Sequence, residues 1–112
     1  MITELTRMWL TRSTKPFLFK NEYDQELPFS DCDGLGLYVH IPFCRSICSF
    51  CPYCKTLYSE EACSRYIDAL IREIHLAGSQ APGKKTVTSL YFGGGTPALA
   101  ADRIKEIIDA IR

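Results

Sequence analysis

The chain has 112 residues, of which 46% are hydrophobic and 23% are charged, values typical of one globular domain with a core of ordinary size. Its 13 Lys and Arg residues balance its 13 Asp and Glu residues, so the net charge of zero gives no indication of a nucleic-acid partner. No run approaches the roughly 20 apolar residues of a membrane span, and the N-terminus lacks the apolar core of a signal peptide. We therefore predict a cytoplasmic protein that binds small molecules rather than nucleic acid or membranes.

The first 34 residues carry no recognisable motif and are predicted to form an N-terminal extension without an assigned role. Leu5, Met8 and Trp9 have the spacing of a short helix. The segment from Lys15 to Lys20 is predicted to be extended. Regular organisation begins at Leu35, so residues 35–112 are treated as the main part of the chain.

The first predicted strand leads directly into a cluster of cysteines. Residues 35–41 mix β-branched, aromatic and leucine side chains and end at Pro42, as a buried strand does. Cys44, Cys48 and Cys51 follow with the spacing C-x3-C-x2-C. Three thiolates so close together can hold three irons of a [4Fe–4S] cluster and leave the fourth iron without a protein ligand, because a complete cage normally uses four cysteines. The pattern predicts a cluster with one open iron.

Two other uses of these cysteines stay open. With Cys54, the three cysteines could form a structural zinc site with four thiolates, although zinc sites usually separate two ligand pairs by a longer spacer. Disulfides between such near neighbours would close only small loops, which gives little entropic stabilisation, and no secretory signal is present. Cys32 and Cys63 are interpreted as small residues without a ligand role.

A helix is predicted after the cysteines. Ser59 is a plausible N-cap, followed by two glutamates in the first turn, where the helix dipole favours anions. Gly78 is expected to end the helix. The apolar stripe at helical spacing consists of Cys63, Ile67, Leu70, Ile71 and Ile74.

A second strand is predicted from Thr86 to Phe92, and the run Gly93-Gly94-Gly95-Thr96-Pro97 follows it immediately. The chain then ends in an isoleucine stripe that predicts a last helix: Ile104, Ile107, Ile108 and Ile111. Strands that alternate with helices imply right-handed crossovers and a parallel sheet, so the cysteine loop and the glycine loop should emerge at one edge. We predict an α/β fold.

The predicted elements leave part of the sheet uncovered. Two parallel strands with two helices cannot cover both faces of a sheet, and no Gly or Pro stops the final helix before Arg112. A complete (β/α) barrel usually needs about 250 residues. The expectation from the sequence is therefore a truncated chain, the N-terminal piece of a larger protein.

Three segments together resemble the radical S-adenosylmethionine (SAM) family, and most of all its branch of oxygen-independent coproporphyrinogen III oxidase. They are Tyr38-Val39-His40-Ile41-Pro42-Phe43-Cys44, the cysteine cluster with Phe50 before its third cysteine, and Tyr91-Phe92-Gly93-Gly94-Gly95-Thr96-Pro97. The resemblance covers residues 35–112. It implies the first two βα units of a partial (β/α) radical SAM barrel, with residues 35–112 as the N-terminal part of that domain.

The resemblance also implies roles for single residues. Cys44, Cys48 and Cys51 would be the metal ligands of a [4Fe–4S] cluster whose open iron chelates SAM, and reductive cleavage of SAM would release a 5′-deoxyadenosyl radical. The implied SAM contacts are Tyr38, Phe50, Gly94, Gly95 and Thr96. An electron donor such as flavodoxin or ferredoxin is implied, with a tetrapyrrole as substrate in porphyrin or haem biosynthesis. Glycines suit such a site because backbone without Cβ atoms can approach a ligand closely.

Some residues have plainer interpretations. His40 is predicted to be a strand histidine whose ring is satisfied by a neighbour, and Tyr38 on the same side of the strand could belong to the core. In coproporphyrinogen oxidase a further cysteine follows the third ligand after one residue, whereas here Pro52 and Tyr53 come before Cys54. The substrate assignment is therefore less specific than the cluster. Haem chaperones, haem-degrading methyltransferases of the same branch and a non-catalytic cluster- or zinc-binding module are the alternatives.

Overall fold

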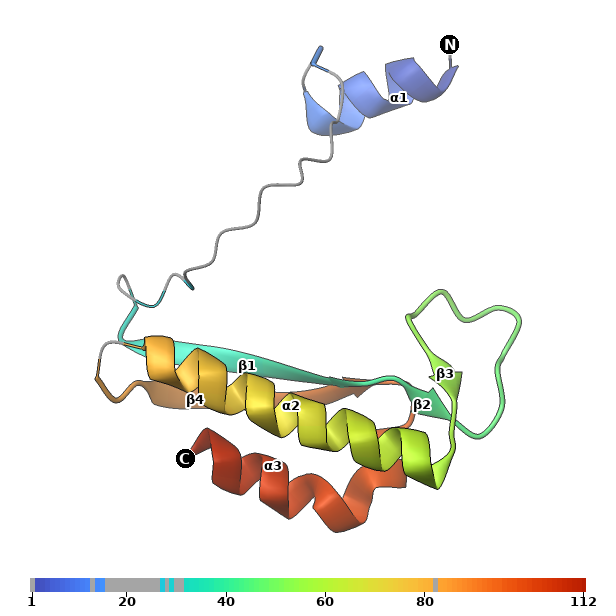
Figure 1. Cartoon of the computed structure of the whole chain (residues 1–112). Coiled ribbons are helices and arrows are strands. Elements are labelled where there is room, and N and C mark those ends of the chain that lie inside the picture. Colours follow the sequence, from blue (N-terminus) through green and yellow to red (C-terminus); the bar gives the residue numbers. More distant parts are fainter. Residues whose placement is uncertain (1, 13, 16–26, 28, 30–31, 82) are drawn as a thin grey trace.

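The computed structural model describes residues 2–12, 14–15, 27, 29, 32–81 and 83–112. The helix predicted near the N-terminus is confirmed and lies apart from the other elements (Figure 1). The extended segment predicted between residues 15 and 20 lies, beyond Lys15, outside the described residues. The elements in chain order are α1 (Ile2–Thr11), β1 (Gly34–Ile41), β2 (Phe43–Cys44), β3 (Thr56–Leu57), α2 (Glu60–Gln80), β4 (Thr86–Gly94), the 3-10 helix η1 (Pro97–Arg103) and α3 (Ile104–Ile111).

Strands β1 and β4 form a parallel two-stranded sheet, which confirms the α/β class and the parallel pairing. The register runs from Gly34 opposite Thr86 to Ile41 opposite Gly94, with one irregularity next to Leu35. The prediction that the second strand ends at Phe92 is wrong by two residues, because the next two glycines still pair with the end of β1. The sheet therefore extends to Gly94, the first residue of the glycine turn at residues 94–96.

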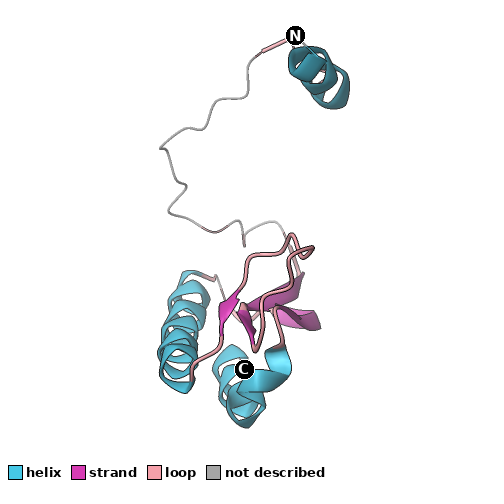
Figure 2. Cartoon of the chain, turned by 90° about the vertical axis from the view of Figure 1, so that its right-hand side faces the viewer, coloured by secondary structure: helices cyan, strands magenta, loops and turns pink. Residues whose placement is uncertain are grey.

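Helices α2 and α3 cover one face of the sheet, and the other face carries no helix within the described residues (Figure 2). Alternate side chains of β1 point toward the helices, as the period of a strand requires. The side chain of Ile41 is fully buried with Ile67 of α2 and Ile107 of α3. Each such side chain contributes about 1.5–3 kcal/mol through its burial. The remaining core residues are Val39, Phe43, Cys63 and Ala100.

The capping prediction for α2 is confirmed, and its predicted end is wrong. The Ser59 hydroxyl accepts a hydrogen bond from the Ala62 N–H at 3.1 Å. The helix continues through Gly78 to Gln80, and Ala81 then adopts an extended conformation. A residue that precedes proline is disfavoured in the α region, so the break is set by the Ala81-Pro82 sequence and not by the glycine.

A second, very short parallel pair was not predicted. Strands β2 and β3 pair Phe43 with Thr56 and Cys44 with Leu57. Hydrogen bonds from Thr56 N–H to Pro42 O (2.7 Å) and from Tyr58 N–H to Cys44 O (2.8 Å) complete the pair. Two residues are too few to show an alternating pattern in the sequence. The pair matters because it closes the base of the loop that carries the other cysteines.

Among the described residues, no helix has both the length and the apolar character that crossing a membrane requires.

Candidate metal and cofactor site

Cys44 and the glycine turn are in direct contact at the carboxyl edge of the sheet. A Cβ atom placed on Gly95 would lie 2.7 Å from Cys44 Sγ and 2.5 Å from Phe43 O, so only glycine fits there. The Thr96 hydroxyl lies 4.0 Å from Cys44 Sγ, within hydrogen-bonding distance for sulfur. These contacts confirm the prediction that the cysteine and glycine loops emerge at the same edge of the sheet.

The glycine turn is fixed by the backbone of the first two strands. Gly94 has φ +110, and a Cβ atom on it would lie 2.7 Å from Ile41 O. The Gly95 N–H donates to Ile41 O at 2.9 Å, and the Thr96 N–H donates to Phe43 O at 2.7 Å. These two donors are therefore used within the sheet. The glycines allow close packing of the strand ends, and their contact with SAM stays a prediction.

The cysteine loop, residues 45–55, contains no helix or strand. The Cys51 N–H donates to Cys48 O at 3.3 Å, and the Lys55 ammonium donates to the Cys51 carbonyl. Cys48 and Cys54 are exposed, Cys51 is half-buried, and all six cysteines are free thiols. Within the described part of the chain, no three Cys, His, Asp or Glu side chains are gathered around one possible metal position. The structure therefore fixes Cys44 at the sheet edge without bringing the other two predicted ligands onto it.

The residues present nevertheless fit an iron–sulfur cluster. Thiolates are the ligands that such clusters use, and the chain offers three free thiols with suitable spacing in one loop. Both ends of the loop are held, at Cys44 by β2 and the glycine turn and at Thr56 by β3. Cys48 is exposed and lies between these two ends, in a segment without helix or strand.

Tyr38 and His40 lie next to one another on the uncovered face of the sheet. The Tyr38 hydroxyl is 3.0 Å from His40 Nδ1, and His40 Nε2 is 3.1 Å from the backbone oxygen of Cys54. The prediction that neighbours satisfy His40 is confirmed. The Tyr38 ring stacks on the Tyr91 ring with centroids 5.8 Å apart and an interplanar angle of 18°. Tyr38 is 59% exposed, so the interpretation of this residue as part of the core is wrong.

Two predicted residues differ sharply in burial. Phe50 is 86% exposed in the cysteine loop, where its ring is accessible to a ligand. Cys63 is buried on α2, in agreement with its interpretation as a small core residue, and this burial raises the pKa of its thiol.

The sequence analysis did not identify Tyr66 as a neighbour of the site. Its hydroxyl donates to His40 O at 2.6 Å. Its spacing from Cys63 and Leu70 along α2 was the available signal.

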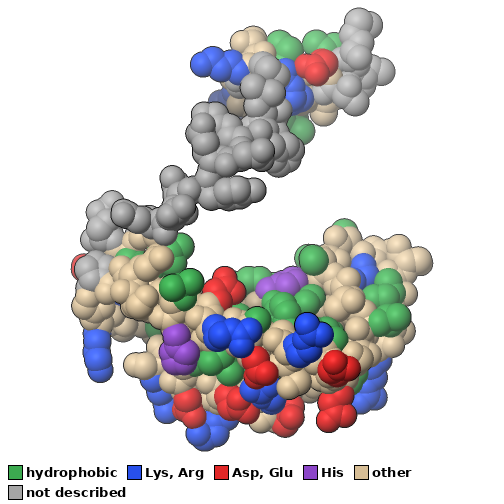
Figure 3. Space-filling model, viewed as in Figure 1, with side chains coloured by type: hydrophobic (Ala, Val, Ile, Leu, Met, Phe, Trp, Pro, Cys, Tyr) green, Lys and Arg blue, Asp and Glu red, His purple; other side chains and the backbone are tan. Residues whose placement is uncertain are grey.

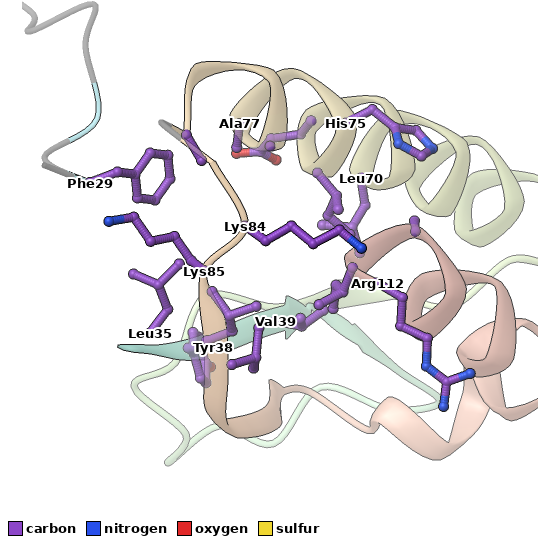
Figure 4. A pocket seen from close by; sticks show the side chains of 18 of the residues that line it. Phe29, Leu35, Tyr38, Val39, Leu70, His75, Ala77, Lys84, Lys85 and Arg112 are labelled. Atoms are coloured by element: carbon purple, nitrogen blue, oxygen red, sulfur yellow. The ribbon is translucent and has the colours of Figure 1, made fainter. Parts of the chain in front are cut away.

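The surface around the site carries few charges. Positive and negative side chains are mixed over the two helices (Figure 3), whereas the only charged residues of the cysteine loop are Arg45 and Lys55. A groove of about 760 Å³ lies between β1, the second half of α2 and the end of α3, and Tyr38 and His40 are among its lining residues. Leu35, Val39 and Leu70 line it, and the side chain of Lys84 lies across its opening (Figure 4). The four cysteines between residues 44 and 54 do not line this groove.

The chain matches no family model and no solved structure. It is 45% identical over 78 residues to an anaerobilin synthase from Escherichia coli O157:H7, a match that covers 68% of this chain and 18% of the relative. It is 38% identical over 80 residues to an oxygen-independent coproporphyrinogen III oxidase from Pseudomonas aeruginosa, covering 70% and 17% of the two chains. It is 35% identical over 77 residues to the heme chaperone HemW from Bacillus subtilis, covering 66% and 20%.

These relatives decide the family. The chain belongs to the radical SAM family, in the branch of oxygen-independent coproporphyrinogen III oxidase. This radical SAM chain spans between 17% and 20% of the length of the three relatives. The contact between Cys44 and Gly95 thus joins two of the segments on which the resemblance depends.

Proposed function

We propose that the chain supplies the cluster-binding and SAM-binding part of a protein that acts on a tetrapyrrole. The observation that carries the proposal is the contact between Gly95 and Cys44 Sγ, which places the predicted SAM turn against a predicted cluster ligand. The relatives named coproporphyrinogen III oxidase and heme chaperone support the choice of a tetrapyrrole.

In this proposal Cys44, Cys48 and Cys51 hold three irons of a [4Fe–4S] cluster. When bound, the reduced cluster supplies an electron that cleaves SAM and yields a 5′-deoxyadenosyl radical, which removes a hydrogen atom from the substrate. Cofactors carry such chemistry, and the protein contributes binding, orientation and the exclusion of water. The electron comes from a donor such as flavodoxin or ferredoxin.

The residues around Cys44 restrict its side chain and place a hydroxyl beside its sulfur. The fixed glycine turn blocks the Cys44 sulfur from one side, which limits the directions from which it can bind iron. The Thr96 hydroxyl is within hydrogen-bonding distance of the same sulfur. Hydrogen bonds to cluster sulfurs are one of the means by which proteins set reduction potentials. Thr96 thus has a role toward the cluster in addition to its proposed contact with SAM.

The remaining SAM contacts would come from two side chains and the glycine turn. The exposed ring of Phe50 provides a surface for the adenine, and Tyr38 lies on the open face of the sheet near the turn. Gly94 and Gly95 have no Cβ atoms, so the methionine end of SAM can approach the backbone carbonyl groups of the turn.

The reaction that we propose is oxidative decarboxylation of coproporphyrinogen III propionates to vinyl groups. A haem-binding chaperone is the second candidate, because the chain is also 36% identical to the heme chaperone HemW of Lactococcus lactis. The two candidates differ in whether the protein converts the tetrapyrrole, as an oxidase does, or only binds it, as a chaperone does.

The first experiment tests the cluster. Anaerobic incubation of the chain with iron and sulfide should give a [4Fe–4S] centre that is lost in Cys44→Ser, Cys48→Ser and Cys51→Ser. Cys54→Ser should keep the centre and serves as the matched control from the same loop. Binding of one zinc ion that depends on Cys54 would instead support the structural zinc site.

The second experiment tests SAM and the substrate, in the longest natural polypeptide that contains the chain. SAM should perturb the electron paramagnetic resonance spectrum of the reduced cluster. With coproporphyrinogen III, 5′-deoxyadenosine and protoporphyrinogen IX should form together. If deoxyadenosine forms no faster with substrate than without it, and haem binds in a one-to-one ratio, the chaperone function replaces the oxidase.

A further inference from the structure

His40 and Cys54 have no role in the proposed chemistry, yet they are joined in the structure. His40 is the second-last residue of β1, and Cys54 lies near the end of the cysteine loop. His40 Nε2 is 3.1 Å from the backbone oxygen of Cys54. Strand β1 is thus connected directly to the end of the cysteine loop.

The partners of His40 determine which of its ring nitrogens carries the proton. A backbone carbonyl only accepts hydrogen bonds, so Nε2 must carry the hydrogen that it donates to Cys54 O. In the neutral ring Nδ1 is then an acceptor, and the Tyr38 hydroxyl, 3.0 Å away, must donate to it. One ring therefore holds the end of the loop and orients the Tyr38 hydroxyl.

The backbone of His40 is held as well. The Tyr66 hydroxyl of α2 donates to His40 O at 2.6 Å, which connects this part of β1 to the helix layer. Within the loop itself, the Lys55 ammonium donates to the Cys51 carbonyl. The contact that joins the end of the loop to β1 is the one between His40 Nε2 and the Cys54 carbonyl, and it uses no cysteine thiol.

We propose that His40 is a positioning residue that holds the exit of the cysteine loop through the Cys54 carbonyl and fixes the direction of the Tyr38 hydroxyl. It limits where Cys51 can lie relative to Cys44. The connection exists in the chain by itself, and only its consequence for the cluster rests on the proposed function. Because the contact uses the Cys54 backbone, it does not require a cysteine at that position.

The first test reads the tautomer and requires no substitution. Nitrogen-15 NMR of the metal-free chain at neutral pH should show His40 protonated at Nε2 and unprotonated at Nδ1. The exposed His75 of α2 is the internal reference and should show the mixture of tautomers typical of a histidine in water. A His40 protonated at Nδ1, or a mixture like that of His75, would overturn the proposal.

The second test measures trypsin cleavage after Lys55, the residue next to the held carbonyl, with cleavage after Lys84 as internal reference. His40→Gln keeps an amide donor at the Nε2 position, whereas His40→Asn has none that reaches Cys54 O. Loss of one hydrogen bond should raise the relative cleavage rate about threefold to tenfold in His40→Asn. His40→Gln and Cys54→Ala should stay near the wild-type rate. Equal rates in His40→Asn and wild type would refute the role.

The third test adds the cluster. After reconstitution, His40→Asn should shift the reduction potential or speed the loss of iron to a chelator, and His40→Gln should restore the wild-type value. If no variant binds a cluster while the NMR and cleavage results hold, the proposed function fails and the positioning role stands. If the cluster forms but the two variants behave alike in cleavage and in iron loss, the positioning role fails alone.

Discussion

The glycine turn at residues 94–96 and the cysteine loop at residues 45–55 meet at one edge of the sheet but are held in different ways. Successive residues of the glycine turn are bonded to the backbone of the first two strands, and its Cα atoms contact that backbone directly. The cysteine loop is held at its two ends, while Cys48 between them is exposed. The strand backbone therefore fixes the glycine turn along its length and the cysteine loop at its two ends.

This difference is consistent with the ligands proposed above for the two halves of the site. A turn that receives an organic cofactor gains from a fixed shape, because a preformed site loses less conformational entropy on binding. A loop that supplies three thiolates must close around an ion cluster, and metal binding of this kind is commonly coupled to folding. The following four predictions test the contrast, from the largest expected effect to the smallest.

The largest effect is expected at Gly95. In Gly95→Val the side chain would meet Phe43 O and Cys44 Sγ at distances that no packed structure allows, so we expect a loss of more than about 3 kcal/mol in the free energy of unfolding. Gly78→Ala on α2, where a Cβ atom meets nothing within 4 Å, is the matched control and should stabilise the chain by about 0.5–1 kcal/mol. Urea denaturation measures both. A Gly95→Val chain as stable as wild type would show that the turn is not fixed as described.

A smaller effect is expected where β1 is anchored to α2. Tyr66→Phe removes the hydrogen bond to His40 O and should lower the free energy of unfolding by about 1 kcal/mol. The exposed Tyr58→Phe, near the end of the cysteine loop, is the control and should change it by less than about 0.5 kcal/mol. Equal effects of the two substitutions in urea denaturation would contradict the anchoring of the strand end.

The thiol of Cys63 is buried, whereas Cys48 and Cys54 in the loop are exposed. Burial raises the pKa of Cys63 in the folded chain above its unfolded value. The folded state therefore binds more protons at alkaline pH, so this contribution to stability is present at neutral pH and is lost as the pH rises above the unfolded pKa. Cys63→Ala should weaken the alkaline decline in melting temperature relative to the wild type. An unchanged decline in Cys63→Ala would exclude the buried thiol as its cause.

The smallest effect on stability is expected at Phe50. Because this ring is mostly exposed, Phe50→Ala should change the free energy of unfolding by less than about 0.5 kcal/mol. Its affinity for SAM should nevertheless fall about threefold to thirtyfold, in line with the energy of an aromatic contact. Equilibrium binding of SAM to the reconstituted chain is the measurement, with Ile47→Ala in the same loop as control. Unchanged affinity in Phe50→Ala would remove this residue from the SAM site.

The sequence predicted the strands, the main helix and their parallel order because each depends on a local and repeated pattern. Leu35, Val39 and Ile41 alternate as a strand requires, and Ser59 precedes a helical stripe. The β2–β3 pair was missed because two residues carry no period. The partners of His40 could not be predicted, because they join a strand to a loop carbonyl and depend on side-chain directions in space. The position of Cys48, in a loop without helix or strand, is not specified by local propensity.

The parallel pairing of β1 with β4 also has a consequence for the order of events during folding. Each pair in this sheet joins residues separated by the whole cysteine loop and α2. Contacts between such distant residues form late, because a long stretch of chain must be closed before any of them is gained. Helix α2 is local and can form early. On the ribosome, Cys44 therefore emerges well before Gly95, and the thiols stay without their partner turn until β4 has been synthesised.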